Sequence, residues 1–245
     1  YGAFSGETSL QSIILPEGIT LVDGNAFNNS GLEAITLPES LEEIGQYAFS
    51  KTNLTEVVIP ANVQLLGSSA FQGSSSPISP LKKVVFKGNK IETIELATFQ
   101  DCQNLQEINL PESVKTIQYN AFLRCYALEE ITIPDAVTSI EKQAFSQCES
   151  LKRVYLGTQL ESIGNNAFNK CLALETIVCP DETPATLGSG VFPVSDSWGS
   201  YTANYKIYVP DAQVDAYRTA WPAYWDSTSW VPTKVIFPMS TMPTE

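Results

Sequence analysis

Phenylalanine recurs along this chain at nearly constant intervals, and this periodicity limits the folds that the chain can adopt. The intervals are 23, 22, 22, 28, 23, 23, 23 and 24 residues. A unit of this length cannot bury an apolar core alone, so successive units must stack and share one continuous core. The periodicity therefore predicts a solenoid. The series comprises Phe4, Phe27, Phe49, Phe71, Phe99, Phe122, Phe145, Phe168 and Phe192.

Each unit also carries apolar residues at relative positions 0, 3 and 5, and a proline follows in most units. One example is Leu105, Ile108 and Leu110, followed by Pro111. Alternating apolar positions are typical of an extended strand with one buried face. Proline ends such a strand because it has no amide hydrogen to donate. We therefore expect one short strand per unit, with the phenylalanine anchoring a turn on the opposite wall.

If positions 0, 3 and 5 point inward, positions 2 and 4 point outward and form two columns on the strand face. Extended faces of this kind are the usual binding surfaces of repeat proteins. The alternative is that position 4 is rich in β-branched residues only because these favour strands. The candidate ligand face consists of Glu56, Lys83, Glu107, Asn109, Glu130, Thr132, Arg153 and Tyr155.

Four cysteines each lie three residues after a repeat phenylalanine, so they form a column in the stack. A column of thiols could indicate a metal or redox site. Earlier units place Ser30, Thr52 and Ser74 at the same position, however, which favours a buried site for a small residue. Cys179 replaces an aliphatic strand residue and is predicted to lie in the core. The column comprises Cys102, Cys125, Cys148 and Cys171.

The charge balance and the missing histidine exclude several kinds of chemistry. The chain has 27 acidic and 14 basic residues and a formal net charge of -13, which argues against binding to nucleic acid phosphates. Without histidine there is no Ser-His-Asp triad and no histidine-ligated metal. No carboxylate pair stands out by motif, and no apolar run approaches the ~20 residues that span a bilayer. We therefore expect no enzyme, no cofactor and no membrane insertion by this segment.

The unit that begins after Phe71 is longer than its neighbours. Its extra segment, residues 72–80, is rich in serine and proline and should form a surface loop that either binds a ligand or is neutral. A basic cluster follows and could bind a heparin-like or other acidic ligand. The alternative is that these lysines pair with acidic residues of the same chain. The cluster consists of Lys82, Lys83, Lys87 and Lys90.

The repeat decays after residue 180, and residues 181–245 are predicted to form an irregular last repeat and a C-terminal cap. Open solenoid ends expose core and strand edges and therefore need a cap. Asp211 could cap a short helix over residues 212–220 that Pro222 ends, and the tail could add one more strand. All four tryptophans lie between Trp198 and Trp230. These aromatic residues either pack the cap or form a carbohydrate or cation platform. The candidate aromatic patch is Trp198, Tyr201 and Tyr205.

Two segments, CQNLQEINLPESVKTIQYNAF and CYALEEITIPDAVTSIEKQAF, resemble the BspA-like, Treponema pallidum-type leucine-rich repeat. The family pattern is C-x-x-L-x-x-I-x-L-P-x-x-V-x-x-I-x-x-x-A-F, and it recurs over about residues 3–180. The resemblance implies a leucine-rich-repeat solenoid of the α/β type, made mostly of short parallel strands and turns. We expect a right-handed curved stack of about eight repeats over residues 1–180, closed by the aromatic-rich C-terminal cap.

Membership of this family implies a bacterial protein that is secreted or held at the cell surface, and some members resemble adhesins for host matrix proteins. The expected function is therefore a non-enzymatic adhesion or protein-interaction module. It would bind an extracellular protein of a host or neighbouring cell through the outward-facing strand ladder. Two alternatives remain open, a structural spacer and a carbohydrate-binding surface module that takes a glycan.

Overall fold

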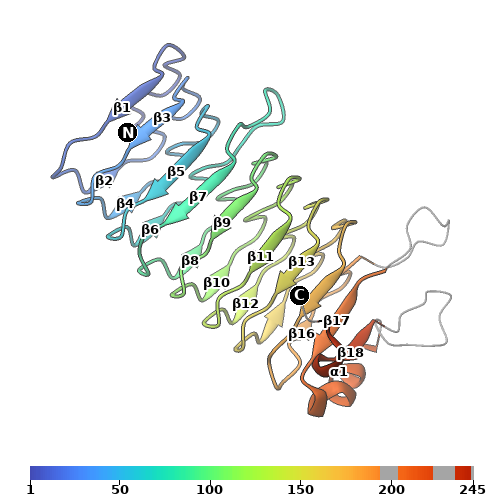
Figure 1. Ribbon diagram of the computed structural model, residues 1–245. Helices are drawn as coiled ribbons and strands as arrows, with labels where there is room; N and C mark the ends of the chain where they lie inside the picture. Colours follow the sequence, from blue (N-terminus) through green and yellow to red (C-terminus); the bar gives the residue numbers. More distant parts are fainter. Residues whose placement is uncertain (194–203, 223–234, 244–245) are drawn as a thin grey trace.

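The computed structural model describes residues 1–193, 204–222 and 235–243 of the chain. It is a solenoid in which each coil contributes a longer strand to a first ladder and a two-residue strand to a second ladder (Figure 1). The first ladder contains β1 (Ser12–Ile14), β3 (Ala34–Thr36), β5 (Glu56–Ile59), β7 (Lys83–Phe86), β9 (Glu107–Asn109), β11 (Glu130–Thr132), β13 (Arg153–Tyr155) and β15 (Thr176–Val178). The second ladder contains β2 (Leu21–Val22), β4 (Glu43–Ile44), β6 (Leu65–Leu66), β8 (Thr93–Ile94), β10 (Thr116–Ile117), β12 (Ser139–Ile140), β14 (Ser162–Ile163) and β16 (Thr186–Leu187).

Strands of successive coils pair in parallel, with equivalent residues in register. Ile131 of β11 lies opposite Val154 of β13, which lies opposite Ile177 of β15. These three position-3 residues are at most 1 % exposed, whereas Glu130 and Thr132 on either side of Ile131 are exposed. The structure therefore confirms the solenoid fold class and the inward and outward positions of the strand.

The repeat phenylalanines form one column of stacked rings in the turns that follow the second ladder and precede the first-ladder strand of the next coil. Consecutive ring centroids from Phe4 to Phe192 lie 4.9 to 5.7 Å apart, with interplanar angles of 2 to 19°. Backbone hydrogen bonds join successive coils in the same register as the rings. For example, the amide of Phe122 donates to the carbonyl of Ala144 in the next coil at 2.7 Å. The predicted phenylalanine turn is thus a second source of register between coils.

In most coils the turn around the ring has two residues in the left-handed backbone region. In the coil of Phe145 these are Gln143 and Gln147, with φ of 59° and 62°. Equivalent positions in most coils are also non-glycine residues, although this conformation costs L-residues roughly 1–2 kcal/mol each. The ring stack and the inter-coil hydrogen bonds hold the turn in this shape.

The first ladder is interrupted twice among the described residues. Strand pairing is continuous within β5-β7-β9 and within β11-β13-β15, but not between β3 and β5 or between β9 and β11. The second ladder is interrupted once, between β6 and β8, in the coil that holds the inserted segment 72–80. That segment forms a protruding loop (Figure 1), closed by an antiparallel bridge between Ser75 and Ile78.

The C-terminal part extends the first ladder beyond residue 180. Strand β17 (Lys206–Val209) pairs with β15, and β18 (Ile236–Pro238) pairs with β17, which confirms the extra strand expected from the tail. Rings from this part cover the end of the phenylalanine column, because Trp221 and Tyr205 lie 6.2 and 6.3 Å from Phe192. The expected cap is therefore a continuation of the sheet and of the aromatic core.

The helix expected over residues 212–220 forms in two parts. It forms as a 3-10 turn, Asp211–Gln213, followed by α1 (Val214–Ala220). Asp211 was expected to cap the helix, which is wrong, because no side chain caps either element. The Asp211 carboxylate instead accepts a hydrogen bond from the amide of Ser240 at 2.9 Å and so ties the 3-10 turn before α1 to the turn after β18. No helix within the described ranges is long and apolar enough to cross a membrane.

The cysteine column is buried and regular. Each thiol donates to the carbonyl of the phenylalanine in the preceding coil, for example Cys148 Sγ to Phe122 at 3.3 Å and Cys171 Sγ to Phe145 at 3.1 Å. All five cysteines are free, and burial raises the pKa of the Cys102 thiol to about 12. Within the described part of the chain, no cluster of three or more cysteine or acidic side chains could hold a metal ion. The four thiols of the column are fully buried and bonded to the backbone of the preceding coil, so they pack within the core.

These thiols should be inert while the stack is folded. Thiolate is the reactive form, so the burial of all five thiols suppresses attack on a disulfide reagent. Burial also raises the pKa of Cys102, Cys125, Cys171 and Cys179, which lowers their thiolate fraction further. We expect no reaction of the native protein with Ellman's reagent at pH 8, and reaction of all five thiols in guanidinium chloride. Rapid modification of even one thiol in the native protein would show that the column opens to solvent.

Candidate functional site

The eight residues of the candidate ligand face all lie on the outer side of the first ladder. Six of them are exposed, while Arg153 and Tyr155 are half-buried. They come from five successive strands, so the face runs along the stack and is not confined to one coil. The exposed residues are Glu56, Lys83, Glu107, Asn109, Glu130 and Thr132.

Charged residues on this face form ion pairs between neighbouring coils. Lys83 of β7 pairs with Glu107 of β9, and Arg153 of β13 pairs with Glu130 of β11. The hydrogen bond from Lys83 to the Glu107 carboxylate raises the pKa of Lys83 above its usual value. These two ion pairs offset the charges of Glu107 and Glu130, which follow one another in the column at position 2.

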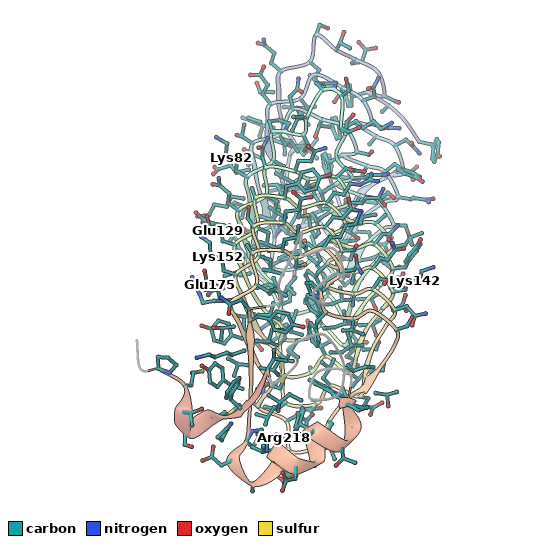
Figure 2. The ribbon with its side chains drawn as sticks, turned by 90° about the vertical axis from the view of Figure 1, so that its right-hand side faces the viewer. Lys82, Glu129, Lys142, Lys152, Glu175 and Arg218 are labelled. Carbon is teal, nitrogen blue, oxygen red and sulfur yellow. The ribbon has the colours of Figure 1, made fainter. Side chains whose placement is uncertain are left out.

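A second charged column lies beside the first, at position 1 of the repeat. Figure 2 shows Lys82, Glu129, Lys152 and Glu175 following one edge of the stack. Lys152 Nζ lies 2.8 Å from a carboxylate oxygen of Glu129, and this pairing lowers the pKa of Glu129. The strand face is therefore bordered by alternating charge.

The basic cluster predicted to bind an acidic ligand is largely paired within the chain. Besides Lys83, Lys87 Nζ lies 2.9 Å from a carboxylate oxygen of Glu39. Lys90 Nζ donates to the side-chain oxygen of Asn62 at 2.8 Å. These contacts favour the alternative of intramolecular partners over a heparin-like site.

Asn109 contacts the preceding coil instead of pointing freely into solvent. Its side-chain oxygen accepts from the amide of Phe86 at 3.2 Å, and its side-chain nitrogen donates to the carbonyl of Phe86 at 3.1 Å. In other coils a backbone carbonyl at position 4 takes the equivalent amide, as Tyr155 does for Ile133. Asn109 thus clamps β9 to β7, and its amide is not free for a ligand.

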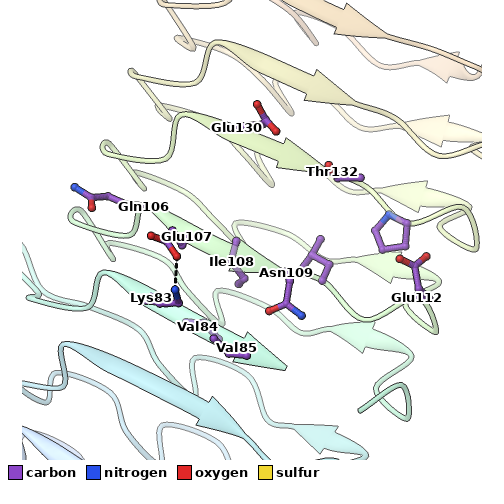
Figure 3. Close-up of a pocket in the computed structure, with 12 residues that line it drawn as sticks. Lys83, Val84, Val85, Gln106, Glu107, Ile108, Asn109, Glu112, Glu130 and Thr132 are labelled. Carbon is purple, nitrogen blue, oxygen red and sulfur yellow. Dashed lines mark ion pairs between the residues drawn. The ribbon is translucent and has the colours of Figure 1, made fainter. Parts of the chain in front are cut away.

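A cleft of about 510 Å³ lies across β7, β9 and β11 (Figure 3). Its lining combines apolar groups of Ile108, Leu110 and Pro134 with polar side chains on both sides. The carboxylates of Glu107, Glu112 and Glu130 outnumber Lys83 around it. Five residues of the candidate ligand face line the cleft: Lys83, Glu107, Asn109, Glu130 and Thr132.

The cleft coincides with the interruption between β9 and β11. In paired coils the amides at positions 1 and 2 donate to the carbonyl at position 1 of the preceding coil, as Lys152 and Arg153 do to Glu129. Over the described ranges, no such bond joins Glu129 or Glu130 to Gln106. The gap also exposes part of the core, because Ile108 is half-buried whereas its counterpart Ile131 is 1 % exposed.

A smaller cleft, of about 370 Å³, lies at the other interruption of the same ladder. It lies between β3 and β5, and Glu56 of the candidate ligand face belongs to its lining. Ile35 in this cleft is half-buried, like Ile108. The strand face is therefore hollowed where the ladder opens, which no feature of the repeat pattern had indicated.

Hydrogen exchange should detect the open rung. The amides of Glu129 and Glu130 have no partner across the gap, whereas those of Lys152 and Arg153 are bonded to Glu129. We expect the first two amides to exchange at least about tenfold faster than the second two, measured residue by residue by NMR. Equal protection at both rungs would show that β9 and β11 pair in solution.

The candidate aromatic patch does not form a surface with Tyr205. That side chain is 2 % exposed, and its hydroxyl donates to the carbonyl of Pro193 at 2.8 Å. Its inclusion in a ligand platform is therefore wrong, because the ring packs against the end of the phenylalanine column. Trp198 and Tyr201 lie outside the described residues.

Comparison with known proteins agrees with the repeat geometry. Residues 1–79 and 78–197 match the BspA type leucine rich repeat region, in six copies. The chain belongs to this family. No curated protein matches it.

Two solved structures resemble the BspA-type chain in fold. A leucine-rich repeat protein from Bacteroides ovatus is 22 % identical with a TM-score of 0.61, and the alignment covers 85 % of this chain and 57 % of that protein. One from Eubacterium ventriosum is 24 % identical with a TM-score of 0.58, covering 65 % of this chain and 42 % of that protein. This BspA-type chain thus spans about half the length of these relatives.

Proposed function

We propose that this chain is a non-enzymatic module that binds an extracellular protein through the first-ladder face. One observation carries the proposal, the cleft across β7, β9 and β11, which joins five outward residues of the repeat to an exposed part of the core. Buried apolar centres with polar rims are typical of protein interfaces. The outer positions of β1 and β5 add aliphatic groups, because Ile14 is 78 % and Val58 41 % exposed.

Family membership supports an extracellular setting for this module. BspA-type repeats resemble surface adhesins of bacteria, so we place the chain at the cell surface or in the secreted fraction. The first-ladder face combines a cleft, charged side chains and exposed aliphatic groups, which suits a contact surface for a protein. A structural spacer needs no cleft. It becomes the favoured function only if the chain binds no partner.

The test is binding of the purified chain to immobilised fibronectin, fibrinogen and a glycan panel over a salt series. We expect saturable binding to a protein that weakens with salt, because exposed charges are screened within about 10 Å at 0.1 M ionic strength. Salt-insensitive binding to glycans alone would move the site away from the charged face. Absence of binding to every surface would overturn the proposal in favour of the spacer.

A further inference from the structure

We propose that the open rung between β9 and β11 binds a short extended segment of the partner, with basic side chains flanking an aliphatic one. This inference rests on the proposed function and assigns its anchoring site. Three independent features of the rung support it: unpaired backbone groups, a half-buried apolar side chain in the cleft and an excess of carboxylates.

The first feature is the unpaired backbone on the two walls of the opening. The Gln106 carbonyl on one side and the Glu129 and Glu130 amides on the other make no ladder bond within the described ranges. All three residues are exposed. An extended chain supplies matching donors and acceptors, which is how a peptide adds to the open edge of a sheet. The backbone of the segment would thus provide affinity independently of its sequence.

The opening between β9 and β11 does not pass through the solenoid, so the partner's segment would rest on the core side of the cleft. On the second ladder β10 still pairs with both β8 and β12, and these coils are joined before the strands by the bond from the Ala127 amide to Gln103 at 3.1 Å. The coils therefore part only at the strand face. Ile108, which is half-buried, offers an apolar contact for one aliphatic side chain, beside the buried Leu110 and Pro134 of the lining.

The charge around the opening favours particular side chains beside the aliphatic residue of the partner's segment. Three carboxylates, Glu107, Glu112 and Glu130, line the cleft with one cation, Lys83. Arg153 of the next coil pairs with Glu130, so among the described residues Glu112 is the lining carboxylate without an ion pair. Lys83 is held by Glu107, and the chain as a whole carries a formal net charge of -13. Complementary charge speeds association and disfavours acidic competitors. Lysine or arginine side chains beside the aliphatic anchor therefore fit this site, and acidic ones do not.

The probe is a synthetic seven-residue peptide, capped at both ends, with the order serine-lysine-valine-lysine-valine-lysine-serine. Its matched control replaces the three lysines by glutamates. A second control carries N-methyl groups on the central backbone amides, which removes donors but keeps the side chains. Binding is measured by calorimetry at low salt, and the amides of Glu129 and Glu130 are followed by NMR hydrogen exchange.

Two protein variants separate the open rung from the rest of the face. Thr132→Tyr places a ring over the opening and copies Tyr155, the residue at the same position of the next coil. Val178→Tyr makes the same kind of change at position 4 of β15, in a rung that is fully paired. Both positions are on the outer face, so both variants should fold, which circular dichroism would verify.

We expect the lysine peptide to bind saturably and to slow exchange of the Glu129 and Glu130 amides. Thr132→Tyr should weaken this binding by about tenfold or more, and Val178→Tyr should leave it within about twofold. The glutamate and N-methyl peptides should not saturate. Absence of saturable binding, or equal binding by the two tyrosine variants, would overturn the assignment of the rung.

The two proposals fail in different ways. If the chain binds fibronectin or fibrinogen with the same affinity in Thr132→Tyr as in Val178→Tyr, the module binds proteins but not through the open rung. If no matrix protein is bound, the proposed function fails, whatever the peptide does. The peptide result therefore decides the site, and the matrix proteins decide the function.

Discussion

Replacing Phe145 by alanine is expected to lower the free energy of unfolding by about 3–5 kcal/mol, the usual range for a buried phenylalanine. Phe145 is fully buried, and its ring lies 4.9 Å from Phe122 and 5.1 Å from Phe168. Its removal leaves a cavity in the middle of the column and takes a stacking partner from both neighbours. Each lost aromatic pair contributes about 0.5–1.5 kcal/mol beyond the buried area.

Denaturant unfolding followed by circular dichroism would measure this loss. Phe4→Ala is the matched control, because Phe4 has one ring neighbour and is 36 % exposed. It should cost much less than Phe145→Ala. A loss below about 1 kcal/mol for Phe145→Ala would mean that the column does not hold the coils together.

The largest effect on binding is expected from a triple replacement on the strand face, Glu107→Gln, Glu130→Gln and Tyr155→Ala. These residues lie on three successive strands, and two of them line the larger cleft. A central aromatic residue and central charges are typical of the few positions that dominate an interface. The triple variant should weaken binding to the matrix protein by roughly tenfold or more, measured by surface plasmon resonance.

The matched control makes the same replacements elsewhere on the coils, Glu92→Gln, Glu161→Gln and Tyr119→Ala. Glu92 pairs with Lys115 as Glu107 pairs with Lys83, and Tyr119 is 36 % exposed. This variant should bind like the original chain. If both triple variants bind with unchanged affinity, the strand face is not the binding surface.

The repeat pattern predicted the parts of the fold that depend on many coils acting together. The phenylalanine column, the first ladder and the buried thiols all follow from residues that recur in phase, because stacking places equivalent residues above one another. The second ladder was not expected. Its strands, such as β10 (Thr116–Ile117), hold only two residues, which is too short for an alternating pattern to be recognised.

The site was only partly predictable, because its hollow arises where the coils depart from the repeat. Alternation placed Glu107, Glu130 and Thr132 on the outer face, but it could not show that β9 and β11 fail to pair. Asn109 was assigned to a ligand from its outward position, whereas its amide bonds to the backbone of Phe86. An asparagine in a column otherwise rich in β-branched residues was the one signal of this clamp.

The role of Tyr205 could not be predicted either, since composition alone cannot distinguish a surface platform from a packed cap.

The central claim, that the first-ladder face binds the partner, is tested most directly by hydrogen exchange of the chain alone and saturated with the matrix protein that it binds. We predict slower exchange over residues 105–110 and 128–133, which contain β9 and β11. Exchange over residues 143–147 of a phenylalanine turn and 206–222 of the cap should not change. Protection confined to the turns or the cap, with none on these strands, would contradict the account.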